Sequence, residues 1–179
     1  MDGRGVGTGR YGDAMSVAQP APSPGRSLRV LALTLGTSPL IVLVAILFVL
    51  PPDQGELSVV GAAAALGAVV LGFLAAQTIG YRVAALEPGL DEAAARRASV
   101  QAFQTTMILR FVLTEAPLIA ALALSFVLDE GPWPFVLAVV VGVPSMLFHV
   151  LVRPRTIERV RAGLEARGAR SYVAEALTP

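Results

Sequence analysis

Residues 58–81 read SVVGAAAALGAVVLGFLAAQTIGY, a stretch without a single charged side chain. A helix needs about 20 consecutive apolar residues to cross the hydrocarbon layer of a bilayer. In lipid the backbone must satisfy its own hydrogen bonds, so a run of this kind predicts a transmembrane α-helix. The stretch therefore indicates the class of protein, an all-α integral membrane protein.

Three further apolar runs of comparable length occur along the chain. They cover residues 30–50, 100–128 and 133–152. With 58–81, these runs predict four transmembrane helices in one domain, residues 28–152. Each run should be helical despite its many Val and Ile residues, because the bilayer offers the backbone no other partner.

The composition excludes several kinds of site. The chain has 179 residues, of which 55% are hydrophobic and 15% charged. It contains no Cys and a single His, at position 149, which excludes disulfides, thiolate metal sites and multi-histidine metal sites. No catalytic constellation is recognisable. We therefore expect no enzymatic activity, no metal site and no cofactor, although bound lipids are expected.

The arginines predict the orientation of the chain. All basic residues are Arg, and outside the apolar runs they lie only before the first run, between the second and third, and after the fourth. The connections 51–57 and 129–132 carry acidic residues only. Because basic residues stay on the cytoplasmic side, both termini are predicted to be cytoplasmic. The expected location is the bacterial inner (cytoplasmic) membrane, with the chain crossing it four times.

The two ends of the chain lie outside the apolar runs. Residues 1–27 are rich in Gly, Pro, Ser and Ala, which predicts a flexible tail. After the fourth run, Ile157, Val160 and Leu164 fall on one side of a helical wheel. This basic amphipathic tail, residues 153–179, either lies on anionic lipid or docks on a partner, or it is a solvated cytoplasmic extension.

Small residues recur at every fourth position of the second run. They are Ala64, Ala68, Gly72, Ala76 and Gly80. Such a stripe lets the backbone of a neighbouring helix approach closely. We expect these five residues to form a helix-packing surface.

The third run contains two ionisable residues, Arg110 and Glu115, with Thr114 beside them. Ionisable groups within membrane helices are functional candidates because hydrocarbon solvates them poorly. We expect Glu115 to lie beside the small-residue stripe near residues 67–72, and Arg110 to extend towards the cytoplasmic interface. Glu115 is then a structural carboxyl, an ion-binding group together with Thr114 and Arg110, or a contact for a cofactor or lipid.

Residues 58–128 combine the small-residue run, a connection, and a helix with the segments TTM (105–107) and LTEA (113–116). This combination resembles the hairpin of the rotary ATP synthase c subunit. In that family a carboxylate in the second hairpin helix binds the transported proton, and Glu115 matches its position. The resemblance implies a cytoplasmic hairpin connection and a proton- or cation-binding role for Glu115.

His149 lies near the cytoplasmic end of the fourth run, one turn after Ser145. A His in a membrane helix can ligate haem or the magnesium of a chlorophyll-type pigment, and the small Ser145 would leave room for a flat macrocycle. The alternative is a His that hydrogen-bonds to water or to a neighbouring residue. Both interpretations stay open at the level of the sequence.

Together these features favour a non-catalytic accessory or structural subunit of a larger membrane complex. The packing stripe and the tails motivate the subunit role. The c-subunit resemblance motivates an energy-converting complex of respiratory, photosynthetic or ATP-synthase-like type. The alternative is a c-subunit-like proton- or cation-binding protein that uses Glu115. Expected partners are other integral membrane proteins and anionic lipid headgroups, but no nucleic acid.

Overall fold

The computed structural model describes residues 24–177, which form six α-helices and one short 3-10 turn. They are α1 (Pro24–Val49), η1 (Pro52–Gln54), α2 (Val59–Thr78), α3 (Glu92–Val127), α4 (Trp133–Val150), α5 (Pro154–Leu164) and α6 (Val173–Leu177). No strand occurs in this part of the chain. The first four helices are each long and apolar enough to cross a membrane. The four predicted helices are thus confirmed, and they indicate a multi-pass membrane protein.

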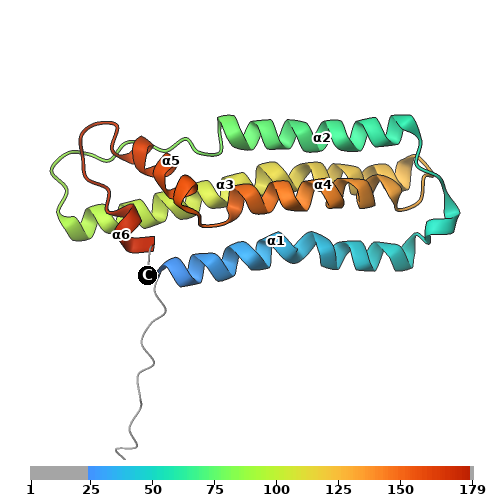
Figure 1. The fold of residues 1–179 in the computed structure, drawn as a ribbon, viewed down its shortest axis with the longest axis horizontal. Helices are drawn as coiled ribbons and strands as arrows, with labels where there is room; N and C mark the ends of the chain where they lie inside the picture. Colours follow the sequence, from blue (N-terminus) through green and yellow to red (C-terminus); the bar gives the residue numbers. More distant parts are fainter. Residues whose placement is uncertain (1–23, 178–179) are drawn as a thin grey trace, which may run out of the picture.

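The four long helices form an elongated bundle. In Figure 1, α3 and α4 run side by side through the middle, with α2 along one side and α1 along the other. Helix α4 is the most enclosed of the four, and α1 is the least. We call the end that carries α5, α6 and the connection 79–91 the arginine end. The opposite end, formed by residues 50–58 and 128–132, is called the acidic end.

Two helices begin earlier than the hydropathy predicts. Helix α3 starts at Glu92 rather than near residue 100, because the Asp91 side chain caps it by accepting a hydrogen bond of 2.7 Å from Ala94 N. Helix α1 starts at Pro24, so residues 24–27 are helical and not part of a flexible tail. The rest of that predicted tail, residues 1–23, lies outside the described residues. Hydropathy marks the part of a helix that suits lipid, whereas capping decides where the helix begins.

Helices α2 and α3 are in close contact at Gly72. A Cβ atom at this position would lie 2.5 Å from Pro117 Cγ and 2.7 Å from Leu113 O. Pro117 has no N–H, so it leaves the Leu113 carbonyl without its helical donor, and the two residues together form a protrusion on α3. Only a residue without a side chain can lie against that protrusion.

The predicted packing stripe is partly wrong within the chain. Gly72, Ala76 and Gly80 are buried as expected, but Ala64 is exposed and Ala68 is only half-buried. A step of four residues exceeds the helical repeat of 3.6, so such a stripe drifts by about 40° per step. The buried residues of α2 correct this drift, because they are four positions apart except between Val69 and Gly72, which are three apart. They are Gly61, Ala65, Val69, Gly72 and Ala76.

The acidic end is held by Glu130. Its carboxylate accepts hydrogen bonds from Ser58 Oγ at 2.5 Å and Ser58 N at 3.3 Å, immediately before α2. Ser58 in turn caps the helix by accepting from Gly61 N at 3.0 Å. Trp133, the first residue of α4, donates from Nε1 to Gly55 O at 2.9 Å. These contacts tie the two connections of this end to each other.

At the arginine end, α5 packs on the chain itself. The apolar face predicted there, Ile157, Val160 and Leu164, is buried together with residues of α3, including Phe103. The connection 79–91 is also bound to α5 through its main chain, because Leu86 N donates a hydrogen bond to Leu164 O at 2.9 Å. The expectation that this face rests on lipid or on a partner is therefore wrong. The surface that covers it comes from the apolar part of α3, at Phe103, and from α1, at Leu28.

Glu165 holds the turn between α5 and α6. Its Oε1 accepts from Ser171 N at 3.1 Å and from Ser171 Oγ at 2.9 Å, while Arg161 Nε lies 3.2 Å from its other oxygen. Burial alone would raise the pKa of Glu165, but the bonds from Ser171 and Arg161 outweigh it, and the pKa lies below its ordinary value.

We predict that acid loosens this turn. A depressed carboxyl pKa contributes stability that is complete above the ordinary value of 4.5 and is lost as the pH falls below it through the folded-state pKa. The hydrogen-exchange protection factors of residues 171–177, which are rates corrected for the intrinsic pH dependence of amide exchange, should therefore fall below that pH. Glu165→Gln should show low protection factors already at neutral pH and no such fall. Wild-type protection factors that stay constant between pH 7 and 3 would contradict the prediction.

We also predict that Gly72→Ala lowers thermal stability in detergent, because the added methyl group overpacks the Pro117 contact at a cost of about 1–3 kcal/mol. Gly67→Ala is the matched control on the same helix, since a Cβ there meets nothing within 4 Å. That control should be neutral or stabilising by at most about 1 kcal/mol. Equal melting temperatures for the two variants would contradict the packing role of Gly72.

Candidate functional site

Tyr81 lies just after α2, within cation–π distance of two arginines. The guanidinium carbon of Arg110, on α3, lies 4.4 Å from the ring centroid, and that of Arg159, on α5, lies 4.9 Å from it. Arg159 Nη1 also donates to Gln77 Oε1 at 2.5 Å. Aromatic faces attract cations electrostatically, so one ring joins three helices. We call Tyr81, Arg110 and Arg159 the tyrosine–arginine cluster.

Arg110 is fully buried, although its side chain was expected to extend to the interface. Its Nε donates to Thr106 O at 3.0 Å, whereas neither terminal nitrogen has a hydrogen-bond partner among the described residues. Gly80 makes room for it, because a Cβ there would lie 2.5 Å from Arg110 Cγ. The Arg110 guanidinium therefore contacts the ring of Tyr81, whereas the sequence predicted that it would reach the aqueous interface. A buried guanidinium without a carboxylate raises the positive potential around it.

His149 belongs to the same region. Its Nδ1 lies 3.2 Å from the Tyr81 hydroxyl, and its ring packs 4.8 Å from that of Phe73. The side chain is fully buried, and its Nε2 and the nearby Ser145 Oγ have no partner among the described residues. A macrocycle could reach Nε2 only if the surrounding side chains moved. The geometry therefore favours the hydrogen-bonded His over the predicted pigment or haem ligand.

Glu115 faces a different helix from the one expected. It is half-buried and lines a groove of about 250 Å³ between α3 and α1, together with Ser38, Pro39 and Ile119. The α2 side of α3 at this depth is occupied by Pro117, opposite Gly72. The prediction that Glu115 is buried beside the small-residue stripe is thus wrong, because Pro117 takes that place on the helix.

The predicted set of Glu115, Thr114 and Arg110 does not come together. Thr114 Oγ1 is buried and donates to the backbone of its own helix, 2.9 Å from Arg110 O and 3.0 Å from Phe111 O. The Arg110 guanidinium lies on Tyr81, and Glu115 opens towards α1. Successive residues of a helix point about 100° apart, so neighbours in sequence need not share a face.

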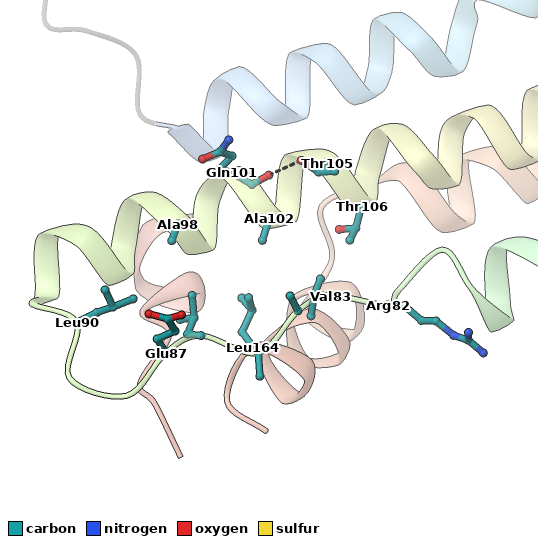
Figure 2. Close-up of a pocket in the computed structure, with 13 residues that line it drawn as sticks. Arg82, Val83, Glu87, Leu90, Ala98, Gln101, Ala102, Thr105, Thr106 and Leu164 are labelled. Atoms are coloured by element: carbon teal, nitrogen blue, oxygen red, sulfur yellow. Dashed lines mark hydrogen bonds between the residues drawn. The ribbon is translucent and has the colours of Figure 1, made fainter. Parts of the chain in front are cut away.

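An open groove of about 510 Å³ lies between the connection 79–91 and α3. Figure 2 shows its two charged side chains well apart, Glu87 on the left and Arg82 on the right of the view. The hydroxyls of Thr105 and Thr106 both donate to carbonyls of their own helix. The rest of the wall is mainly apolar, with Leu86 and Leu164 buried at its base. The groove therefore presents no pair of groups positioned for proton transfer.

Sequence reasoning missed the roles of Tyr81, Gln77 and Arg159. In the sequence, Tyr81 is only the last residue of an apolar run, and Arg159 is only one of the arginines that predict the orientation. No local signal connects them, since 78 residues separate Tyr81 from Arg159 in sequence and only the packing of α5 brings them together. A tyrosine directly after a small-residue stripe is the one hint the sequence contains.

No protein-family model, curated protein or solved structure matches this chain. The c-subunit resemblance therefore stays a prediction from residues 58–128. Within residues 24–177, no three His, Cys, Asp or Glu side chains gather closely enough to hold a metal ion.

We predict that the ring of Tyr81 matters more than its hydroxyl. Tyr81→Phe loses only the contact with His149, at a cost of about 1 kcal/mol. Tyr81→Leu also removes the cation–π partner of two arginines, which should add about 1–3 kcal/mol. Thermal unfolding in detergent measures both variants. Tyr172→Leu is the control, because Tyr172 has one arginine partner at 4.5 Å, and that arginine, Arg170, is exposed. If Tyr81→Leu costs no more than the control, the cluster does not stabilise the fold.

Proposed function

We propose that this chain is a non-catalytic accessory subunit of a larger membrane complex, which docks a partner's transmembrane helix in the groove at Glu115. The single observation that carries the proposal is the environment of that carboxyl group. It opens to the surface of the bundle, and within residues 24–177 it makes no hydrogen bond or ion pair.

The depth of Glu115 makes this exposure costly in a bilayer. It lies twelve residues before the end of α3 at Val127, about 18 Å along the helix axis. The hydrocarbon layer is about 30 Å thick, so the carboxyl group would lie near its middle. Polar groups at such depth face other proteins or water-filled cavities rather than lipid. A hydrogen-bond donor from a partner helix would satisfy it.

The helix on the other side of the groove also favours a partner. Helix α1 is the least enclosed of the four, and Phe48 and Ile41 on it are 84% and 71% exposed. Its Pro39 lies in the groove wall, where Ser38 Oγ donates to Leu35 O at 2.8 Å. Apolar exposure alone would suit lipid equally well. Its position next to an unpartnered carboxyl group is what favours a protein.

The proposal includes an orientation and a location. The arginine end faces the cytoplasm, because the connections of the acidic end carry no basic residue and Lys and Arg are retained inside. The membrane is then the cytoplasmic membrane of a bacterium. An energy-converting complex is proposed from the c-subunit resemblance alone.

The second candidate is a proton or cation carrier that uses Glu115, as the same resemblance implies. Its support is the accessibility of the carboxyl group from the groove. A carrier also needs a polar path to each side of the membrane. Apart from Glu115 and Ser38, the groove is lined by apolar side chains such as Val42 and Leu122. The subunit role therefore fits better.

A photo-crosslinking amino acid at Ile119 tests the subunit role. Ile119 lines the groove and is 59% exposed, whereas Leu71 on α2 is 68% exposed and serves as the control position. In native membranes we expect one discrete heterologous adduct from Ile119 and none from Leu71. An interhelical hydrogen bond contributes about 0.6–2 kcal/mol, so Glu115→Leu should weaken the association about three- to thirtyfold.

Glu115→Gln separates the two functions. The amide retains hydrogen-bonding capacity but cannot carry a proton, so the adduct should persist while carrier activity in proteoliposomes would disappear. Wild-type proton flux that is lost in Glu115→Gln would establish the carrier. An absent adduct, equal adducts from both positions, or an adduct with a second copy of this chain would overturn the accessory role.

A further inference from the structure

A basic pocket of about 300 Å³ lies at the bend between α4 and α5. Three arginines line it: Arg153, Arg155 and Arg159. Tyr81 and Phe148 form its other side, and Pro154 and Thr156 complete it. No carboxylate lines this pocket, which we call the arginine pocket.

The arginines of the pocket have no acidic partner in the described chain. The ion pairs of residues 24–177 use Arg161 and Arg170, with Glu158, Glu165 and Glu175. Arg159 makes one hydrogen bond, to the neutral Gln77. Three guanidinium groups that line one pocket repel each other unless an anion binds among them.

Two further features increase the positive potential. The pocket includes the first turn of α5, where the helix dipole is positive, and Arg153 at the N-cap leaves that turn without a side-chain cap. The fully buried Arg110 lies against Tyr81, which forms part of the wall, and both its terminal nitrogens lack a partner among the described residues. Guanidinium groups match phosphate oxygens in geometry as well as in charge.

The opposite wall indicates what the phosphate is attached to. Phe148 belongs to the apolar helix α4, is 41% exposed, and its ring lies 6.2 Å from that of Phe73 on α2. The pocket thus joins a basic wall to the apolar surface of two membrane-spanning helices. A soluble phosphate would use only the first of these, whereas a phospholipid would use both.

We infer that the arginine pocket binds one anionic phospholipid, with its phosphate at Arg153, Arg155 and Arg159 and its acyl chains along Phe148. The inference rests on the part of the proposed function that places the arginine end at the headgroup level. It does not depend on the groove at Glu115, which lies on another face and at another depth.

Native mass spectrometry of nanodisc-released protein tests this site. The discs contain phosphatidylcholine with increasing fractions of phosphatidylglycerol. Wild type should retain one phosphatidylglycerol, and the triple variant Arg153→Gln, Arg155→Gln, Arg159→Gln should bind it at least about tenfold more weakly. The matched control is Arg96→Gln, Arg97→Gln, Arg167→Gln, which removes the same charge from exposed positions outside the pocket. The control should bind like wild type.

A second experiment, with free inorganic phosphate, tests whether the pocket binds the phosphate of a lipid or a soluble phosphate. Calorimetric titration of the detergent-solubilised protein with inorganic phosphate should show binding at least tenfold weaker than for the lipid. If both triple variants lose phosphatidylglycerol equally, the binding reflects non-specific attraction between arginines and anionic lipid, and the inference is overturned. Tight binding of free phosphate without lipid retention would also overturn it. If the pocket triple does not fold, Arg155→Gln alone should still lower retention, and unchanged retention there would overturn the site. The crosslinking experiment at Ile119 tests the groove at Glu115 only, so its result does not depend on whether the arginine pocket binds lipid.

Discussion

The fit of Gly72 against Pro117 and the Leu113 carbonyl sets how α2 lies along α3, and much of the structure depends on it. The two helices are antiparallel, so a contact at Gly72 places the residues after it opposite the residues before Leu113. Gly80 therefore meets Arg110, and Tyr81 lies over the guanidinium. A shift of either helix by one turn, about 5.4 Å, would leave Arg110 buried without the ring. The close approach thus determines both the packing and the position of the cluster.

The length of α3 has a second consequence, at the arginine end. Because Asp91 caps the helix well before the apolar run begins, its first turns carry a surface of their own. That surface includes Ser99, whose hydroxyl donates to Ser171 O. One turn later, within the apolar run, Phe103 packs with the apolar face of α5. The amphipathic segment after α4 is consequently folded back on the bundle. Its arginines then face the bend between α4 and α5.

Polar groups occupy two different depths of the bundle, with different physical consequences. Glu115 lies in a mainly apolar groove, which in the proposed membrane placement is near mid-depth, and there we propose that a partner helix satisfies the carboxyl group. The arginine pocket and the tyrosine–arginine cluster lie at one end of the bundle, which the proposed orientation places at the level of headgroups and water. The first site suits a hydrogen bond between proteins. The second suits an anion, and its cations are arranged by α5 and the end of α4.

The sequence by itself determined the class of structure, the four long helices and the uneven distribution of arginines, because hydropathy over about 20 residues and charge position are local properties. It also marked Gly72, Ala76 and Gly80 as packing residues. Only the tertiary structure decided which face of α3 each polar residue occupies. Glu115 faces α1 because Pro117 takes the side towards α2, and the Arg110 guanidinium is covered because the ring of Tyr81 lies over it. These outcomes depend on helix rotation and on contacts between segments far apart in the chain, which no local pattern encodes.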